Sequence, residues 1–95
     1  MHDQASQTKR LMALAQAYIE GIAESPTGLV NGYLYALVAQ PAGYNIDEHN
    51  WVVASLKKTG LVSETMNVLL WAGSDDKRQV VLDAIAARQQ RKQEA

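Results

Sequence analysis

The stretch LVSETMNVLLWA, residues 61–72, decides between two fold classes. One interpretation is a short helix that begins at Ser63, carries Glu64 in its first turn and ends before Gly73. The other is a β-hairpin in which residues 61–63 pair with residues 68–71. The turn between them lacks the glycine that two-residue hairpins usually need, so the pattern favours the helix. The sequence therefore predicts an all-α fold, with α-helices and a small β-hairpin wing at 61–71 as the alternative.

Two helices are predicted upstream of this stretch. Apolar residues recur at helical spacing over residues 11–22, which predicts an amphipathic helix over 5–24. Ser25 and Pro26 then supply a cap and a first-turn proline, so a second helix is expected over residues 26–39. Pro41 follows closely, and the residue before a proline disfavours the helical conformation.

The third helix has the clearest boundaries. Asn45 and Glu48 stand at the spacing of a capping box, and Gly60 can adopt the left-handed conformation that ends a helix near Thr59. A last helix is expected to open at Ser74, and its apolar pattern stops near residue 86. The polar residues 89–95 should fray, as should residues 1–5. The pattern predicts one domain over residues 1–95, a compact orthogonal bundle of four to five short helices.

The predicted helix over 26–39 is apolar on almost every side, which is typical of a helix enclosed by its neighbours. We therefore expect it to be the central helix of the bundle. Gly28, Gly32 and Ala36 stand four residues apart on it and predict a ridge that another helix can approach closely. That helix could be the one over 5–24, or the same helix of a second copy in a homodimer.

The composition limits the classes of function. The 95 residues are 47% hydrophobic, contain no cysteine and carry a formal net charge of −1. Disulfides and thiolate chemistry are therefore excluded. The N-terminus lacks the pattern of a signal peptide, and no apolar run approaches the roughly 20 residues that span a bilayer, so a cytoplasmic protein is expected. Basic residues are spread evenly, which lowers the expectation of nucleic-acid binding.

Ionisable residues give little support to catalysis. His2 and His49 are the two histidines, and His49 lies in the polar run of residues 47–50. Consecutive helical residues point about 100° apart, so this run cannot converge on one substrate. We interpret Asp47 and Glu48 as first-turn charges and His49 as a surface or boundary residue with a structural role. No metal-ligand pair, phosphate loop or nucleophile motif is present, so no enzyme, catalytic residue, metal or cofactor is predicted.

These features favour a small non-enzymatic helical module for protein–protein interaction or regulation that associates with itself. The small size of the core is consistent with a need for a partner. Trp51, with Asn50 beside it, stands at the edge of the buried stripe of its helix and is the candidate for contact with a partner protein. Nothing in the sequence identifies that partner.

An alternative function follows from residues 56–62 and 68–71. The first segment would close a recognition helix and the second would be the return strand of a wing, so the chain resembles winged-helix DNA-binding regulators. The resemblance implies a transcriptional regulator. Asp47 and Glu48 depart from it, because they would face phosphates or base edges at the N-terminal end of the recognition helix. Additional phosphate contacts could come from Lys9, Arg10, Arg88, Arg91 and Lys92.

Overall fold

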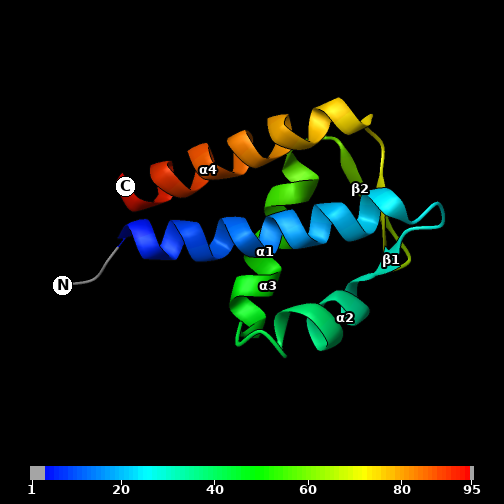
Figure 1. Cartoon of the computed structure of the whole chain (residues 1–95), viewed down its shortest axis with the longest axis horizontal. Helices are drawn as coiled ribbons and strands as arrows, with labels where there is room; N and C mark the ends of the chain where they lie inside the picture. Colours follow the sequence, from blue (N-terminus) through cyan, green and yellow to red (C-terminus); the bar gives the residue numbers. More distant parts are fainter. Residues whose placement is uncertain (1–3, 95) are drawn as a thin grey trace.

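Helix α1 (Gln4–Glu24) forms where the apolar residues recur at helical spacing, as predicted. The computed structural model describes residues 4–94, with side chains described for residues 6–90. Helix α4 (Arg78–Glu94) runs beside α1, and α3 (Ile46–Lys58) lies behind both and contacts each of them (Figure 1). The three helices pack against one another, and a small sheet and the π-helical turn η1 (Tyr35–Ala39) pack against α1 and α3.

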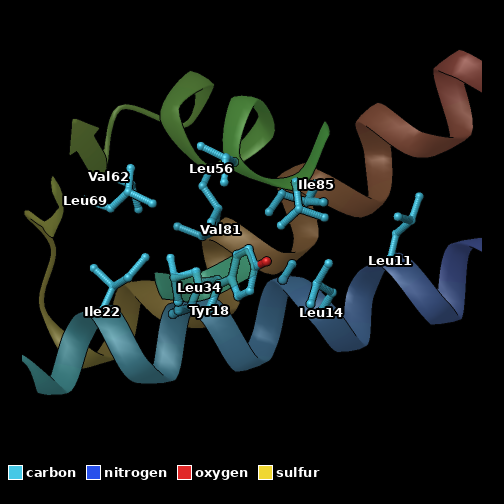
Figure 2. Packing of buried hydrophobic residues seen from close by; sticks show 14 of the residues in the cluster. Leu11, Leu14, Tyr18, Ile22, Leu34, Leu56, Val62, Leu69, Val81 and Ile85 are labelled. Atoms are coloured by element: carbon cyan, nitrogen blue, oxygen red, sulfur yellow. The ribbon is translucent and has the colours of Figure 1, made fainter. Parts of the chain in front are cut away.

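The hydrophobic core lies where α1, α3 and α4 meet the sheet. Figure 2 shows the α1 side chains Leu14, Tyr18 and Ile22 directed towards the opposing elements. Burial of this apolar surface is the main force that holds the helices together. The opposing side chains are Leu56 of α3, Val81 and Ile85 of α4, and Val62 and Leu69 of the strands.

The all-α prediction is wrong, because residues 62–71 form a β-hairpin and not a helix. Strands β2 (Val62–Thr65) and β3 (Val68–Trp71) pair antiparallel, with Thr65 opposite Val68. The loop between them is the two residues Met66 and Asn67, whose φ angles of 52° and 67° are those of a type I′ turn. Asparagine tolerates this conformation and methionine accepts it at some cost, so a glycine is not needed.

The hairpin belongs to a three-stranded antiparallel sheet that the sequence did not predict. Strand β1 (Leu29–Val30) pairs with β3, and the strand order in the sheet is β1-β3-β2. These two residues were expected in a helix, so that prediction is wrong for them. A tight turn precedes it, in which the Ser25 hydroxyl donates to the carbonyl of Gly28 at 2.8 Å. Gly28 has a φ of +83°, and a Cβ there would lie 2.4 Å from the backbone oxygen of Leu69. Only glycine lets this turn approach β3 so closely.

The predicted helix over 26–39 begins later than expected and does not lie at the centre of the molecule. Its helical part is α2 (Asn31–Leu34) followed by the π-helical turn η1 (Tyr35–Ala39). Leu34 and Ala39 are buried, whereas Tyr33 is 49% exposed and Leu37 is 60% exposed. The segment therefore packs on the core through one side only, and α1 is the element with the longest buried stripe.

Both ends of α3 agree with the prediction. Asn45 and Glu48 form a reciprocal capping box, and Gly60 follows the C-cap Thr59 with a φ of +81°. Helix α4 is preceded by the short 3-10 helix η2 (Asp75–Lys77) and continues to Glu94. Gln89 is buried at 3% exposure, so this turn of α4 still packs against the rest of the domain. The expected fraying of residues 1–3 and 95 lies outside the described residues.

Candidate functional site

The first candidate surface is the outer side of α2 and η1. We name it the α2 face and define it as Val30, Gly32, Tyr33, Ala36 and Leu37, all of which are exposed. The three large side chains are 49%, 49% and 60% exposed in chain order, and a Cβ added at Gly32 would have nothing within 4 Å. Small and large apolar residues thus stand together on this side and are about half exposed, and no described atom lies within 4 Å of a Cβ placed at Gly32.

The α2 face is held in place by its two ends. The backbone N–H of Asn31 donates to the carbonyl of Asn67 at 2.7 Å, which fixes the start of α2 on the hairpin. Leu34 and Ala39 are buried on the opposite side of the segment and anchor it in the core. The surface is therefore presented by a backbone that is fixed by contacts to the sheet and to the core.

A chain of hydrogen bonds lies beneath this segment and connects it to α1, α3 and β2. The Tyr18 hydroxyl and His49 Nδ1 are 2.6 Å apart, and His49 Nε2 lies 2.6 Å from Asn31 Oδ1. Asn31 Nδ2 donates to Glu64 at 3.1 Å, and Lys57 Nζ donates to the other oxygen of Glu64 at 2.7 Å. Because the Asn31 oxygen can only accept, Nε2 carries the proton of a neutral imidazole and Nδ1 accepts from Tyr18.

The surroundings of these hydrogen-bonded side chains determine which of them are charged. His49 is 1% exposed and lies against the ring of Tyr35, and burial lowers its pKa. The hydrogen bond from Lys57 lowers the pKa of Glu64, so this carboxylate stays charged. Burial raises the pKa of Tyr18 above its ordinary value. Every polar atom named in this network has a partner, which is typical of a structural hydrogen-bond network.

An ion pair between α1 and α3 involves Glu48, one of the two acidic residues at the start of α3. Arg10 binds Glu48 through two nitrogens, at 2.8 and 3.0 Å, and also donates to the carbonyl of Gly43. The pKa of Glu48 is lowered chiefly by the hydrogen bond from Arg10. The guanidinium also lies 4.2 Å from the centre of the Tyr44 ring. Glu48 therefore serves the capping box and this ion pair, and it is not a free acid.

Trp51 is the centre of the second candidate surface, because it lines one cavity and lies beside Arg88, which lines another. Its ring is half-buried, and the guanidinium carbon of Arg88 lies 5.4 Å from the ring centre. A cavity of about 340 Å³ borders Trp51 together with Asp47 and Glu48. A smaller one of about 130 Å³ lies between α3 and α4, beside Lys58 and Arg88. The first cavity is thus lined by carboxylates and the second by cations.

The structure separates the residues that the sequence grouped together. Gly28 lies in the turn against β3, so it is not on one surface with Gly32 and Ala36, which are both exposed. Asn50 is exposed and Trp51 is half-buried on α3. His2 lies outside the described residues. Gly32 and Ala36 of the α2 face were predicted as a ridge for close packing, whereas its large residues Val30, Tyr33 and Leu37 were expected in the core and are exposed.

Among the described residues, no group of three or more His, Cys, Asp or Glu side chains could hold a metal ion. No helix in residues 4–94 is long and apolar enough to span a membrane. Comparison with protein-family models, with curated proteins and with solved structures finds no match to this chain. The function is therefore inferred from the exposed surfaces and cavities of the structure itself.

Proposed function

We propose that the protein is a non-enzymatic interaction module that pairs with a second copy of itself through the α2 face. The observation that carries this proposal is the exposure of Tyr33 and Leu37 beside Gly32, over whose Cα nothing from the same chain packs. An apolar surface of this kind marks a contact site more often than a solvated one. The glycine allows the backbone of a second helix to approach closely.

The charge distribution supports a second copy as the occupant. From Ser25 to Ile46 the chain contains no charged residue, and the whole α2 face lies in this segment. In a twofold contact each group meets the same surface of the other copy, so a charged face would place like charges near one another. An uncharged face pairs with itself without that repulsion.

The size of the domain supports the same conclusion. A chain of 95 residues buries a modest fraction of its surface, and its stability is correspondingly small. Covering Val30, Tyr33 and Leu37 in a dimer adds apolar burial that the monomer lacks. Self-association would thus stabilise the fold as well as form the interface.

Sedimentation velocity over a range of protein concentrations tests the proposal. We expect the native protein to shift from monomer to dimer as concentration rises, and Leu37→Glu to stay monomeric because its charge would be buried in the contact. Val80→Glu is the matched control, since Val80 is also an exposed apolar residue, at 53%, but lies on α4. A native protein that remains monomeric throughout, or an equal effect of both variants, would contradict the proposal.

A DNA-binding regulator is the second candidate, and the hairpin beside α3 is the observation that favours it. The order α1, β1, α2, α3, β2, β3, α4 is similar to that of winged-helix regulators, in which the third helix enters the major groove and the hairpin is the wing. Asn50, Lys57 and Lys58 lie exposed on α3, where such a helix would contact DNA.

The charges on this side of the molecule favour the first candidate over the second. Lys57 is paired with Glu64, Asp47 lies exposed at the start of α3, and residues 62–71 contain no basic residue. Most non-specific affinity for DNA comes from basic side chains that neutralise phosphates, and this side of the molecule offers few unpaired basic side chains. Fluorescence anisotropy of a labelled duplex at low salt separates the candidates. We expect no binding, whereas a salt-dependent rise in anisotropy would favour the regulator.

A further inference from the structure

Among the residues whose side chains the structure describes, the cavity of about 130 Å³ between α3 and α4 is lined by basic and hydroxyl side chains and one alanine, and by no acid. Its lining residues are Ser55, Lys58, Thr59, Ala84 and Arg88. The volume is well above the roughly 10–15 Å³ that one water molecule requires, so a small polar group fits. Lys58 approaches from α3 and Arg88 from α4, which places two positive charges on one cavity.

Lys58 and Arg88 line one cavity and have no acidic partner, whereas Lys9 and Lys77, which form no ion pair with described residues either, do not line it. Arg10, Lys57 and Arg78 are paired with Glu48, Glu64 and Asp75 respectively. Within the part of the chain that the structure describes, neither Lys58 nor Arg88 forms an ion pair. Arg88 is positioned by the ring of Trp51, 5.4 Å from its guanidinium carbon. Two cations on one cavity without an acid repel one another, and an anion between them removes that cost.

The two hydroxyl groups of the cavity donate their protons to backbone carbonyls, so only the cations can donate to an anion. Ser55 donates its proton to the carbonyl of Trp51 at 2.8 Å, and Thr59 donates to that of Leu56 at 2.6 Å. With these protons engaged, the free donors of the lining are the ammonium of Lys58 and the guanidinium of Arg88. A guanidinium presents its N–H groups in a fork that matches two oxygens of a phosphate.

We propose that this cavity binds a phosphomonoester group or the free phosphate ion. Either carries a charge near −1.5 to −2 at pH 7, which two cations match, whereas a phosphodiester carries a single charge. Arg91 and Lys92 follow Arg88 by three and four residues on α4, so their positions lie one turn further on the same side of the helix. The cavity and the α2 face are built from different residues, so the proposal does not depend on self-association.

The chain's two tryptophans provide the measurement. Trp51 contacts Arg88, while Trp71 lies in β3 and serves as an internal reference. Inorganic phosphate is titrated against chloride at constant ionic strength while the indole N–H signals are followed by NMR. We expect a saturable shift of the Trp51 signal and an unchanged Trp71 signal. A linear drift, or an equal movement of both signals, would overturn the proposal.

Three further ligands distinguish the sources of the phosphate group. Ethyl phosphate that binds as tightly as inorganic phosphate identifies a monoester, and binding of inorganic phosphate alone identifies the free ion. Diethyl phosphate is expected to bind much more weakly, since it lacks the second charge. Equal binding of diethyl phosphate, or a response to duplex DNA alone, would overturn the monoester assignment.

Matched variants locate the site. Lys58→Gln is expected to weaken phosphate binding roughly tenfold, the loss of one charge-assisted contact, and Arg88→Gln is expected to weaken it similarly. Lys57→Gln is the control, because Lys57 occupies the same last turn of α3 but binds Glu64. An equal loss in Lys57→Gln would show a general effect of charge and contradict the site. Lys58 is exposed, so its variant is expected to fold.

Discussion

His49 links four elements through one buried imidazole, so its protonation should affect stability. The fold lowers its pKa below the ordinary 6.5 by burial. The unfolded chain then binds a proton more readily than the folded chain as pH falls below 6.5. We predict a free energy of unfolding that is independent of this residue above pH 6.5 and declines below it, at up to about 1.4 kcal/mol per pH unit, until the folded pKa is passed.

Urea denaturation of the native protein and of His49→Gln across this pH range checks the prediction. The variant is less stable overall because Tyr18 and Asn31 lose their partner, but its stability should not decline in the same window. The pKa values of the Glu48 and Glu64 carboxyls are also lowered, so the stabilisation that they contribute begins to be lost only below about pH 4.5, whereas the loss that His49 causes begins below pH 6.5. Parallel curves for the two proteins would show that His49 does not titrate as described.

Met66 is a second residue whose local conformation has a measurable cost. It has a φ of 52° and is 91% exposed, so its side chain loses little packing when it is replaced. Asparagine adopts this left-handed conformation more readily, and Met66→Asn should stabilise the fold by about 1 kcal/mol. Met66→Ala keeps the unfavourable Cβ and should bring no such gain. Thermal or chemical denaturation of both variants provides the test, and equal gains would point away from backbone strain.

Among the secondary-structure elements, helices α1 and α3 were predicted from local patterns in the sequence. Strand β1 was not predicted, because it depends on pairing between residues that are distant in the sequence. Helices α1 and α3 follow from apolar spacing and from the cap at Asn45, which are properties of neighbouring residues. Strand β1 is two residues long and is defined by its pairing with β3, from which it is distant in sequence. The exposure of Tyr33 and Leu37 on the α2 face was missed for the same reason, since burial of these side chains depends on where the other elements pack.

Gly28 tests whether β1 is placed by its close approach to β3. Gly28→Ala should destabilise the fold by about 2 kcal/mol or more, because alanine disfavours a φ of +83° and its Cβ would meet the Leu69 carbonyl. Gly32→Ala is the control in dilute, monomeric protein, where helix propensity should give a gain of up to about 1 kcal/mol. Denaturation curves of both variants measure these changes in the free energy of unfolding. A Gly28→Ala variant as stable as the native protein would contradict the close approach of the turn to β3.

At the scale of the whole molecule, the two proposed binding surfaces are well separated. In the view of Figure 1, α2 and α4 lie on opposite sides of α1. The α2 face is apolar and uncharged, and the cavity beside Arg88 is basic. A dimer formed through α2 would therefore leave both basic cavities open to a ligand.

The absence of cysteine allows the most direct test of the central proposal, which is a twofold contact through the α2 face. Single cysteines at Gly32 and at Ala36 would meet their own copies across the axis, and a disulfide forms only when the two Cα atoms lie about 4.4–6.8 Å apart. We predict rapid oxidation to a covalent dimer in Gly32→Cys or Ala36→Cys, and slow oxidation in the control Ala84→Cys, an exposed position on α4. Cross-linking that is no faster at the α2 face than at Ala84 would contradict the account.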